Sequence, residues 1–234
     1  MVLRDESFLK RDEAGVLEDS DTLFWVSNNE GARGDVLFFV GNAGHPNMGT
    51  ARSGIWKNHK YKIWVMIYPG FGNAPGAPDE EDIVERAERA QYVLSSSARA
   101  AGKSYALAGY SMGGGLAARI QGKENPDVLV LEAPLANLWQ IARKRYPFLP
   151  RVPGVDRWEN FKHIDKARLN PTLVMHGDKD RVVPFSQGAL MSDLLGGQFI
   201  TLEGAGHNDV LSFGVRKHSS EFLFDIFHGE QALD

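Results

Sequence analysis

The 234-residue sequence contains no cysteine. Disulfide bonds, thiolate catalysis and cysteine-based metal sites are therefore excluded. No apolar run approaches the roughly 20 residues that a membrane-spanning helix needs, so we expect no membrane span. The first six residues are rich in charge and hold no apolar signal core, and we therefore expect a cytoplasmic protein.

The sequence also lacks a strong excess of either charge. It has 26 Lys and Arg against 30 Asp and Glu, a net charge of −4. This balance gives no argument for nucleic acid or an anionic membrane surface as the main partner. The length and ordinary composition predict a single domain spanning residues 1–234. The sequence gives no indication of the oligomeric state.

Short apolar segments alternate with helical patterns along most of the chain. Strands are predicted at 22–27, 36–40, 63–68, 105–108, 128–131, 171–176 and 198–202. Helices are predicted at 50–60, 79–101, 112–122, 185–195 and 211–227. This alternation predicts an α/β fold with a mostly parallel central sheet flanked by helices. Residues 1–21 are polar and show no clear periodicity, so no element is expected there.

One segment, residues 135–169, interrupts the alternation. It is rich in Trp, Arg, Tyr and Pro. We interpret it as a small cap insertion of short helices over the strand ends. The alternative is an ordinary connection whose aromatic side chains only pack.

The residues Gly109-Tyr110-Ser111-Met112-Gly113 fit the pattern G-x-S-x-G between a predicted strand and a predicted helix. A sharp strand-to-helix turn strains the central residue and favours glycine on both sides. The serine hydroxyl then lies at a helix N-terminus, which favours developing negative charge. Ser111 is therefore the candidate nucleophile.

A serine nucleophile needs a base, and the base needs an orienting carboxylate. His207 is the best base, because it lies in a Gly-rich loop after the last predicted strand. The loop after the preceding strand offers two acids, Asp178 and Asp180, and either could instead be a turn former. His176 precedes these acids and is expected to pack or to form a structural hydrogen bond. The other histidines are His45, His59, His163, His218 and His228.

The oxyanion hole is expected to combine two backbone N–H groups. One belongs to Met112, directly after the nucleophile. The other is assigned to Asn42, in the loop after the predicted strand 36–40, where Gly41 allows a tight turn. The alternative is that residues 41–44 form only a turn.

Five motifs in order resemble the α/β-hydrolase superfamily, at 39–44, 68–72, 109–113, 176–180 and 204–209. Among its branches, the chain resembles the small-cap serine hydrolases that include bacterial esterases and eukaryotic protein depalmitoylases. The resemblance implies an α/β-hydrolase fold and makes Asp180 the triad acid. The sequence departs at Val40, where the family usually has a histidine that braces the oxyanion loop, and at Pro69, where an arginine would be usual.

These residues predict a serine hydrolase that cleaves carboxylic esters through an acyl-enzyme, with Ser111, His207 and Asp180 as the triad. No metal or organic cofactor is required. The substrate is expected to be a small acyl ester or thioester, in an apolar pocket lined by Phe71, Trp139 and Tyr146. The alternative for these aromatic residues is packing. Two alternative functions are an acyl-protein or acyl-CoA thioesterase and a non-catalytic binding protein on a hydrolase fold.

Overall fold

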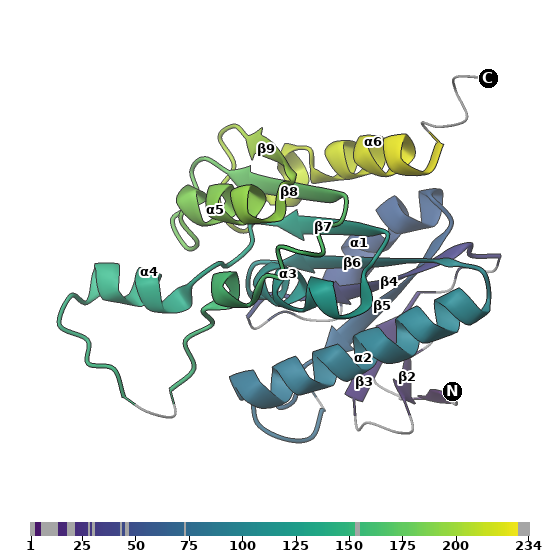
Figure 1. Cartoon of the computed structure of the whole chain (residues 1–234), viewed down its shortest axis with the longest axis horizontal. Coiled ribbons are helices and arrows are strands. Elements are labelled where there is room, and N and C mark those ends of the chain that lie inside the picture. The colour runs from purple at the N-terminus through teal and green to yellow at the C-terminus, as the bar shows by residue number, and fades with distance from the viewer. Residues whose placement is uncertain are drawn as a thin grey trace.

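The structure is a computed structural model. It describes residues 3–5, 14–17, 22–27, 29, 31–42, 44, 47–72, 74–152 and 155–228. In this part of the chain one sheet has the strand order β1-β2-β3-β5-β4-β6-β7-β8-β9 (Figure 1). The strands are β1 (Leu3–Asp5), β2 (Ala14–Leu17), β3 (Thr22–Val26), β4 (Gly34–Phe39), β5 (Tyr61–Ile67), β6 (Ser104–Tyr110), β7 (Val128–Glu132), β8 (Thr172–Gly177) and β9 (Gln198–Leu202).

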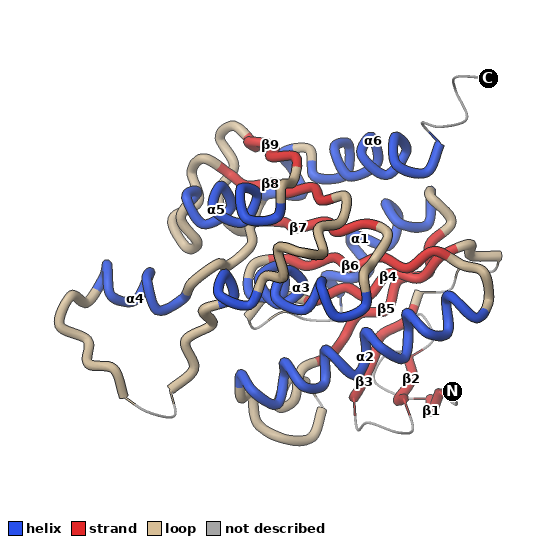
Figure 2. Tube along the Cα trace, in the orientation of Figure 1, coloured by secondary structure: helices blue, strands red, loops and turns tan. Residues whose placement is uncertain are grey.

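Helices cover both faces of this sheet, as Figure 2 shows. They are α1 (Asn47–Asn58), α2 (Glu80–Ala100), α3 (Met112–Glu124), α4 (Leu138–Arg145), α5 (Phe185–Leu195) and α6 (Val215–His228), with the 3-10 helices η1 (Asn160–His163) and η2 (Val210–Phe213). Helices α2 and α3 contact each other, and α1 contacts α6 on the opposite face. None of the described helices has the length and apolarity to cross a membrane.

The predicted α/β fold with a mostly parallel sheet is confirmed. Strands β5, β4, β6, β7, β8 and β9 pair in parallel, and β3 pairs antiparallel with β5. The described residues of β4 are almost all buried, as are those of β7 and β8, which suits strands covered on both faces. The carboxyl ends of these parallel strands therefore share one edge, where an open α/β sheet holds its site.

Two predictions about the elements are wrong. Residues 1–21 contain β1 and β2, which pair antiparallel at the sheet edge. They are only three and four residues long, too short to show a periodicity. The predicted helix 211–227 is split into η2 and α6, because Gly214 between them has a φ of 105°.

Residues between β7 and β8 leave the sheet and carry α4 and η1 beyond the carboxyl ends of the strands (Figure 1). Glu80, at the first turn of α2, holds the returning part of this segment. Its carboxylate accepts the backbone N–H groups of Arg157 and Trp158 at 2.8 and 2.9 Å. The same carboxylate accepts a hydrogen bond from Arg119 of α3 at 2.7 Å. These bonds fix residues 157–158, from which the chain leads back to the sheet.

Candidate active site

Ser111 occupies the turn between β6 and α3. Its φ of 57° and ψ of −120° are strained for a residue with a side chain. The neighbouring glycines make the turn possible. A Cβ atom on Gly109 would collide with the backbone of Gly113, and a Cβ on Gly113 would collide with the carbonyl of Phe39. The pattern G-x-S-x-G is thus required by close packing of backbone on backbone.

Backbone hydrogen bonds hold this strained turn in place. The N–H of Ser111 donates to the carbonyl of Glu132 at 2.8 Å. The carbonyl of Ser111 accepts from Gly115 at 3.1 Å and from Leu135 at 2.9 Å. The turn is therefore tied to β7, to α3 and to the start of the segment that follows β7.

His207 lies within hydrogen-bonding distance of both other residues of the predicted triad. His207, in the loop after β9, has Nε2 2.9 Å from Ser111 Oγ. Its Nδ1 lies 2.6 Å from Asp180 Oδ2, in the loop after β8. Each residue is less than 10% exposed, and the side chain of Asp180 is fully buried. Because an ionised carboxylate only accepts, Nδ1 carries the proton and the lone pair of Nε2 faces the serine.

The structure distinguishes the two candidate acids in the loop after β8. Asp180 contacts His207, whereas Asp178 is directed elsewhere. Oδ1 of Asp178 accepts the N–H of Gly204 at 2.7 Å, and its Oδ2 pairs with Lys179 at 3.3 Å. Asp178 thus joins its own loop to the loop that carries His207.

Asp180 is held by more donors than His207 alone. Its Oδ1 accepts the N–H groups of Val182 and Val183, both at 2.8 Å. His176, fully buried in β8, places Nε2 3.3 Å from Asp180 Oδ2 and 2.9 Å from the carbonyl of Val183. Because a carbonyl only accepts, Nε2 of His176 carries a proton and can also donate to the carboxylate.

These contacts determine the charge of Asp180. Burial opposes ionisation, but the hydrogen bonds from His176, His207 and the backbone of Val182 outweigh it and hold the pKa of Asp180 well below its usual range. The carboxylate therefore stays ionised at neutral pH. The sequence predicted a structural role for His176, by packing or by hydrogen bonding, but did not identify Asp180 as its partner. Its place four residues before Asp180 was the available signal for its contact with the carboxylate.

The loop after β4 lies directly against the serine turn. A Cβ on Gly41 would lie 3.2 Å from Ser111 Cβ, so glycine permits the close approach. The N–H of Gly44 donates to the carbonyl of Gly41 at 2.9 Å and closes the turn, in which Asn42 is exposed. Met112 is the first residue of α3, where backbone N–H groups have no intrahelical partner. The donation of these N–H groups to an oxyanion stays a prediction.

Tyr68 fixes the start of this loop at Val40, the position where the resemblance leads us to expect a histidine. Its hydroxyl donates to the carbonyl of Val40 at 2.7 Å, and both residues are buried. Burial raises the pKa of Tyr68 well above its usual value, so the hydroxyl keeps its proton and remains a donor. This contact was not predictable from the sequence, because it joins residues 28 positions apart in the chain.

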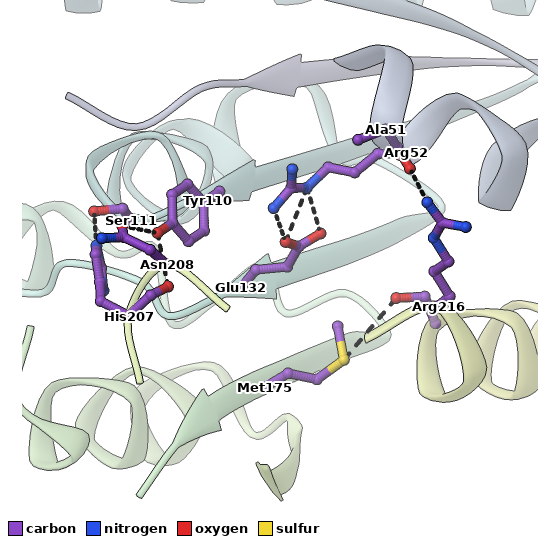
Figure 3. A network of polar contacts seen from close by, with 10 residues as sticks. Ala51, Arg52, Tyr110, Ser111, Glu132, Met175, His207, Asn208 and Arg216 are labelled. Carbon is purple, nitrogen blue, oxygen red and sulfur yellow. Dashed lines mark hydrogen bonds and ion pairs between the residues drawn. The ribbon is translucent and has the colours of Figure 1, made fainter. Parts of the chain in front are cut away.

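A buried ion pair lies behind the serine turn (Figure 3). Nε of Arg52, in α1, donates to both carboxylate oxygens of Glu132 at 2.9 and 3.0 Å. The guanidinium also lies 5.2 Å from the ring centre of Tyr110, and the hydroxyl of Tyr110 donates to the carbonyl of His207 at 2.8 Å. Glu132 also supplies the carbonyl that binds the N–H of Ser111. The pair thus supports both the serine turn and the histidine loop.

The three aromatic residues predicted to line a substrate pocket lie in different surroundings. Phe71 is half-buried and packs edge-on against Tyr68, with 5.5 Å between ring centres. Trp139 is buried and lines a cavity of about 730 Å³ between α4, α5 and η1. Tyr146 is 61% exposed at the end of α4. Neither Phe71 nor Tyr146 lines the cavity next to Trp139, and the substrate contact of the three residues stays a prediction.

No family model matches this sequence. It is 28% identical over 177 residues to an uncharacterised protein of Mycobacterium tuberculosis, covering 74% of this chain and 63% of that protein. It is 25% identical over 214 residues to human α/β-hydrolase domain-containing protein 17B, covering 89% of this chain and 71% of that protein. The chain thus spans about 63% of the length of the mycobacterial relative.

Solved structures share the fold. An α/β serine hydrolase homologue from Coxiella burnetii has a TM-score of 0.68 at 17% identity and covers 94% of this chain and 99% of its own. Esterase Est2 of Thermogutta terrifontis in its native form has a TM-score of 0.69 at 18% identity, covering 96% of both chains. The molecule therefore has the α/β-hydrolase fold. The fold and the names of the sequence relatives agree with the resemblance to the α/β-hydrolase superfamily that the motifs indicated.

Proposed function

We propose that this protein is a serine hydrolase that cleaves carboxylic esters through an acyl-enzyme. The observation that carries the proposal is the continuous chain of contacts from Ser111 Oγ through both ring nitrogens of His207 to Asp180, at 2.9 and 2.6 Å. Ser111 lies on a strained turn at a helix N-terminus, which presents its hydroxyl at the sheet edge. The relatives and the shared fold support a hydrolase but do not choose its substrate.

The first half of the proposed reaction forms the acyl-enzyme. Nε2 of His207 takes the hydroxyl proton as Ser111 Oγ attacks the ester carbonyl carbon. Asp180 stays ionised and stabilises the charged imidazole, since its pKa is held low. The backbone N–H groups of Met112 and Asn42 bind the oxyanion. His207 then gives the proton to the leaving alcohol, and the carbon–oxygen bond to that alcohol breaks.

The second half returns the enzyme to its starting state. His207 removes a proton from a water molecule, whose oxygen attacks the acyl carbon. The intermediate collapses, the bond to Ser111 Oγ breaks, and the serine recovers its proton from His207. The carboxylic acid leaves, so the reaction consumes one ester and one water and needs no external oxidant or reductant.

Two variants of one loop provide a matched test. Asp180→Asn removes the acid next to His207, and we expect kcat on a p-nitrophenyl acyl ester to fall roughly 10³–10⁴-fold. Asp178→Asn makes the same chemical change two residues away, where the carboxylate accepts the N–H of Gly204 and pairs with Lys179 but does not contact His207, and where the amide oxygen of asparagine can still accept from Gly204. We expect that variant to keep kcat within about tenfold of the wild type, because it leaves the triad contacts in place. Equal losses in the two variants would contradict the assignment of the acid.

A fluorophosphonate probe tests the nucleophile directly. The wild type should be labelled at Ser111, and Ser111→Ala should lose both the label and several orders of magnitude in activity. A folded wild-type protein without label would favour the non-catalytic binding protein. A panel of matched esters and thioesters then separates a carboxylesterase from a thioesterase. Short and aromatic acyl groups are the first to test, since related folds were solved with butyrate or ferulic acid bound.

A further inference from the structure

A part of the segment after β7 exposes apolar side chains to solvent. We call residues 138–152, which comprise α4 and the turn after it, the α4 arm. Phe148 is 97% exposed, the most exposed of the large hydrophobic residues in the described part of the chain. Other exposed apolar residues of the arm are Leu138, Tyr146, Leu149 and Val152. Isolated exposed apolar residues are normal, but several on one projecting segment mark an interaction site.

The same arm is strongly basic. It contains four cationic residues and no acidic one: Arg143, Lys144, Arg145 and Arg151. The last turn of α4 holds three of them, all exposed, and no ion pair from these three is found among the described residues. Arg151 pairs with Glu159 at 3.3 Å and lies 5.8 Å from the ring centre of Trp139. The α4 arm therefore carries a local excess of positive charge, although the net charge of the whole chain is −4.

The arrangement of charged and apolar groups follows the path of the arm. Helix α4 ends in its basic turn, and the chain turns at once, with the N–H of Leu149 donating to the carbonyl of Tyr146 at 3.0 Å. Phe148 thus lies at the tip of a tight turn, directly beyond the cations. The arm projects from the body of the molecule beyond the carboxyl ends of the strands (Figure 1). Ser111 follows β6 at the same edge of the sheet.

This combination suits a lipid surface. Lys and Arg are attracted to anionic headgroups, and aromatic residues favour the boundary between headgroups and acyl chains. A projecting apolar tip can insert into that boundary, whereas a protein partner would need a pocket shaped to receive it. We propose that the α4 arm docks this protein onto anionic lipid membranes, with the cations on the headgroups and Phe148 inserted. The docked arm brings the edge that carries Ser111 toward acyl groups at the membrane surface.

Vesicle co-sedimentation tests the docking separately from the reaction. The full chain carrying Ser111→Ala is used, so that lipid hydrolysis cannot alter the vesicles and a failed hydrolase assignment leaves the result intact. We expect binding to vesicles of phosphatidylcholine with phosphatidylglycerol, weak binding to phosphatidylcholine alone, and a loss of binding as salt rises. Equal binding to both compositions, or no binding to either, would overturn the proposal.

Paired variants assign the binding to the arm. Lys144→Glu with Arg145→Glu should weaken binding at least about tenfold, because attraction turns into repulsion. The matched control reverses two exposed cations elsewhere, Lys57→Glu with Lys103→Glu, and should retain most of the binding. Equal losses in both double variants would show a response to net charge alone and would contradict an arm-specific site.

The apolar contribution is tested in the same way. Phe148→Ser removes the exposed ring at the tip and should weaken binding several-fold, with much of the remaining binding sensitive to salt. Tyr92→Ser is the control, because Tyr92 is 60% exposed on α2, away from the arm. Both sites are exposed, so neither substitution should unfold the protein, which circular dichroism checks. Wild-type binding by Phe148→Ser would refute insertion of the tip. Arm-dependent capture of an acidic protein without vesicle binding would assign the arm to a protein partner and overturn the proposal.

Discussion

Replacing Tyr68 with phenylalanine removes a single oxygen atom from beneath the loop of residues 41–44. In the wild type that hydroxyl donates to the carbonyl of Val40 at 2.7 Å in a fully buried setting. No other change in shape is introduced, and the ring can keep its edge-on contact with Phe71. The variant therefore isolates the hydrogen bond that fixes the start of the loop.

The expected magnitude follows from the buried carbonyl left behind. A buried acceptor that loses its partner costs about 1–3 kcal/mol of unfolding free energy. If the loop shifts, the predicted Asn42 N–H donates less well to the oxyanion. Part of the lost energy then raises the activation free energy of the reaction. A share of roughly 1.4 kcal/mol corresponds to a tenfold lower kcat. This is below the roughly 10²–10³-fold loss typical of removing one donor outright.

A second tyrosine supplies the control. The hydroxyl of Tyr105, in β6, is also buried but has no hydrogen-bond partner within the described part of the chain. Tyr105→Phe deletes a buried polar atom without breaking a bond, so we expect unchanged or slightly raised stability and unchanged kcat. Urea unfolding and steady-state kinetics on a soluble p-nitrophenyl ester measure both quantities. If Tyr68→Phe kept wild-type kcat and stability, or if the two variants behaved alike, the role of Tyr68 as a brace would be refuted.

Two further predictions concern buried charge. Glu132→Gln removes the carboxylate that binds the buried Arg52 cation, and urea unfolding should show that the free energy of unfolding falls by about 3–5 kcal/mol. The double variant with Arg52→Met and Glu132→Leu removes both charges, so its free energy of unfolding should fall by less. Equal losses in the two variants would contradict the cost of an uncompensated charge. The folded-state pKa of Asp180 lies below its ordinary value of 3.8, so its stabilising contribution is complete above that pH and is lost as the pH falls toward the folded-state pKa. Between about pH 5 and pH 2, the unfolding free energy of the wild type should therefore fall more steeply than that of Asp180→Asn, and parallel curves would contradict the linkage.

Much of the fold was predictable because its signals are local. The buried strands β4, β5, β7 and β8 are continuous apolar runs, and the predicted positions lie within two residues of the observed bounds. Strands β1 and β2 were missed because short edge strands carry too few residues to form a pattern. The closing helix was predicted as one element because the break depends on the backbone conformation of the single residue Gly214.

The candidate site divides in the same way. The strained turn at Ser111 requires glycines at fixed spacing, so the pattern is visible in the sequence. His207 and the acids near it follow strands whose carboxyl ends share an edge, which topology alone predicts. The contacts of Tyr68 with Val40 and of Arg52 with Glu132 join positions far apart in the chain and leave no local pattern.

The sequence by itself determined which residue types can perform chemistry here and the order in which they occur, because turn geometry and strand ends constrain residues over short stretches. The residues of the loop did not distinguish Asp178 from Asp180, and only the resemblance favoured Asp180. The tertiary structure shows the contact itself, because that depends on how the loops after β8 and β9 meet. It also decided where charge is exposed. The net charge of −4 describes the whole chain. The structure shows that basic and apolar residues of the projecting α4 arm are exposed to solvent together.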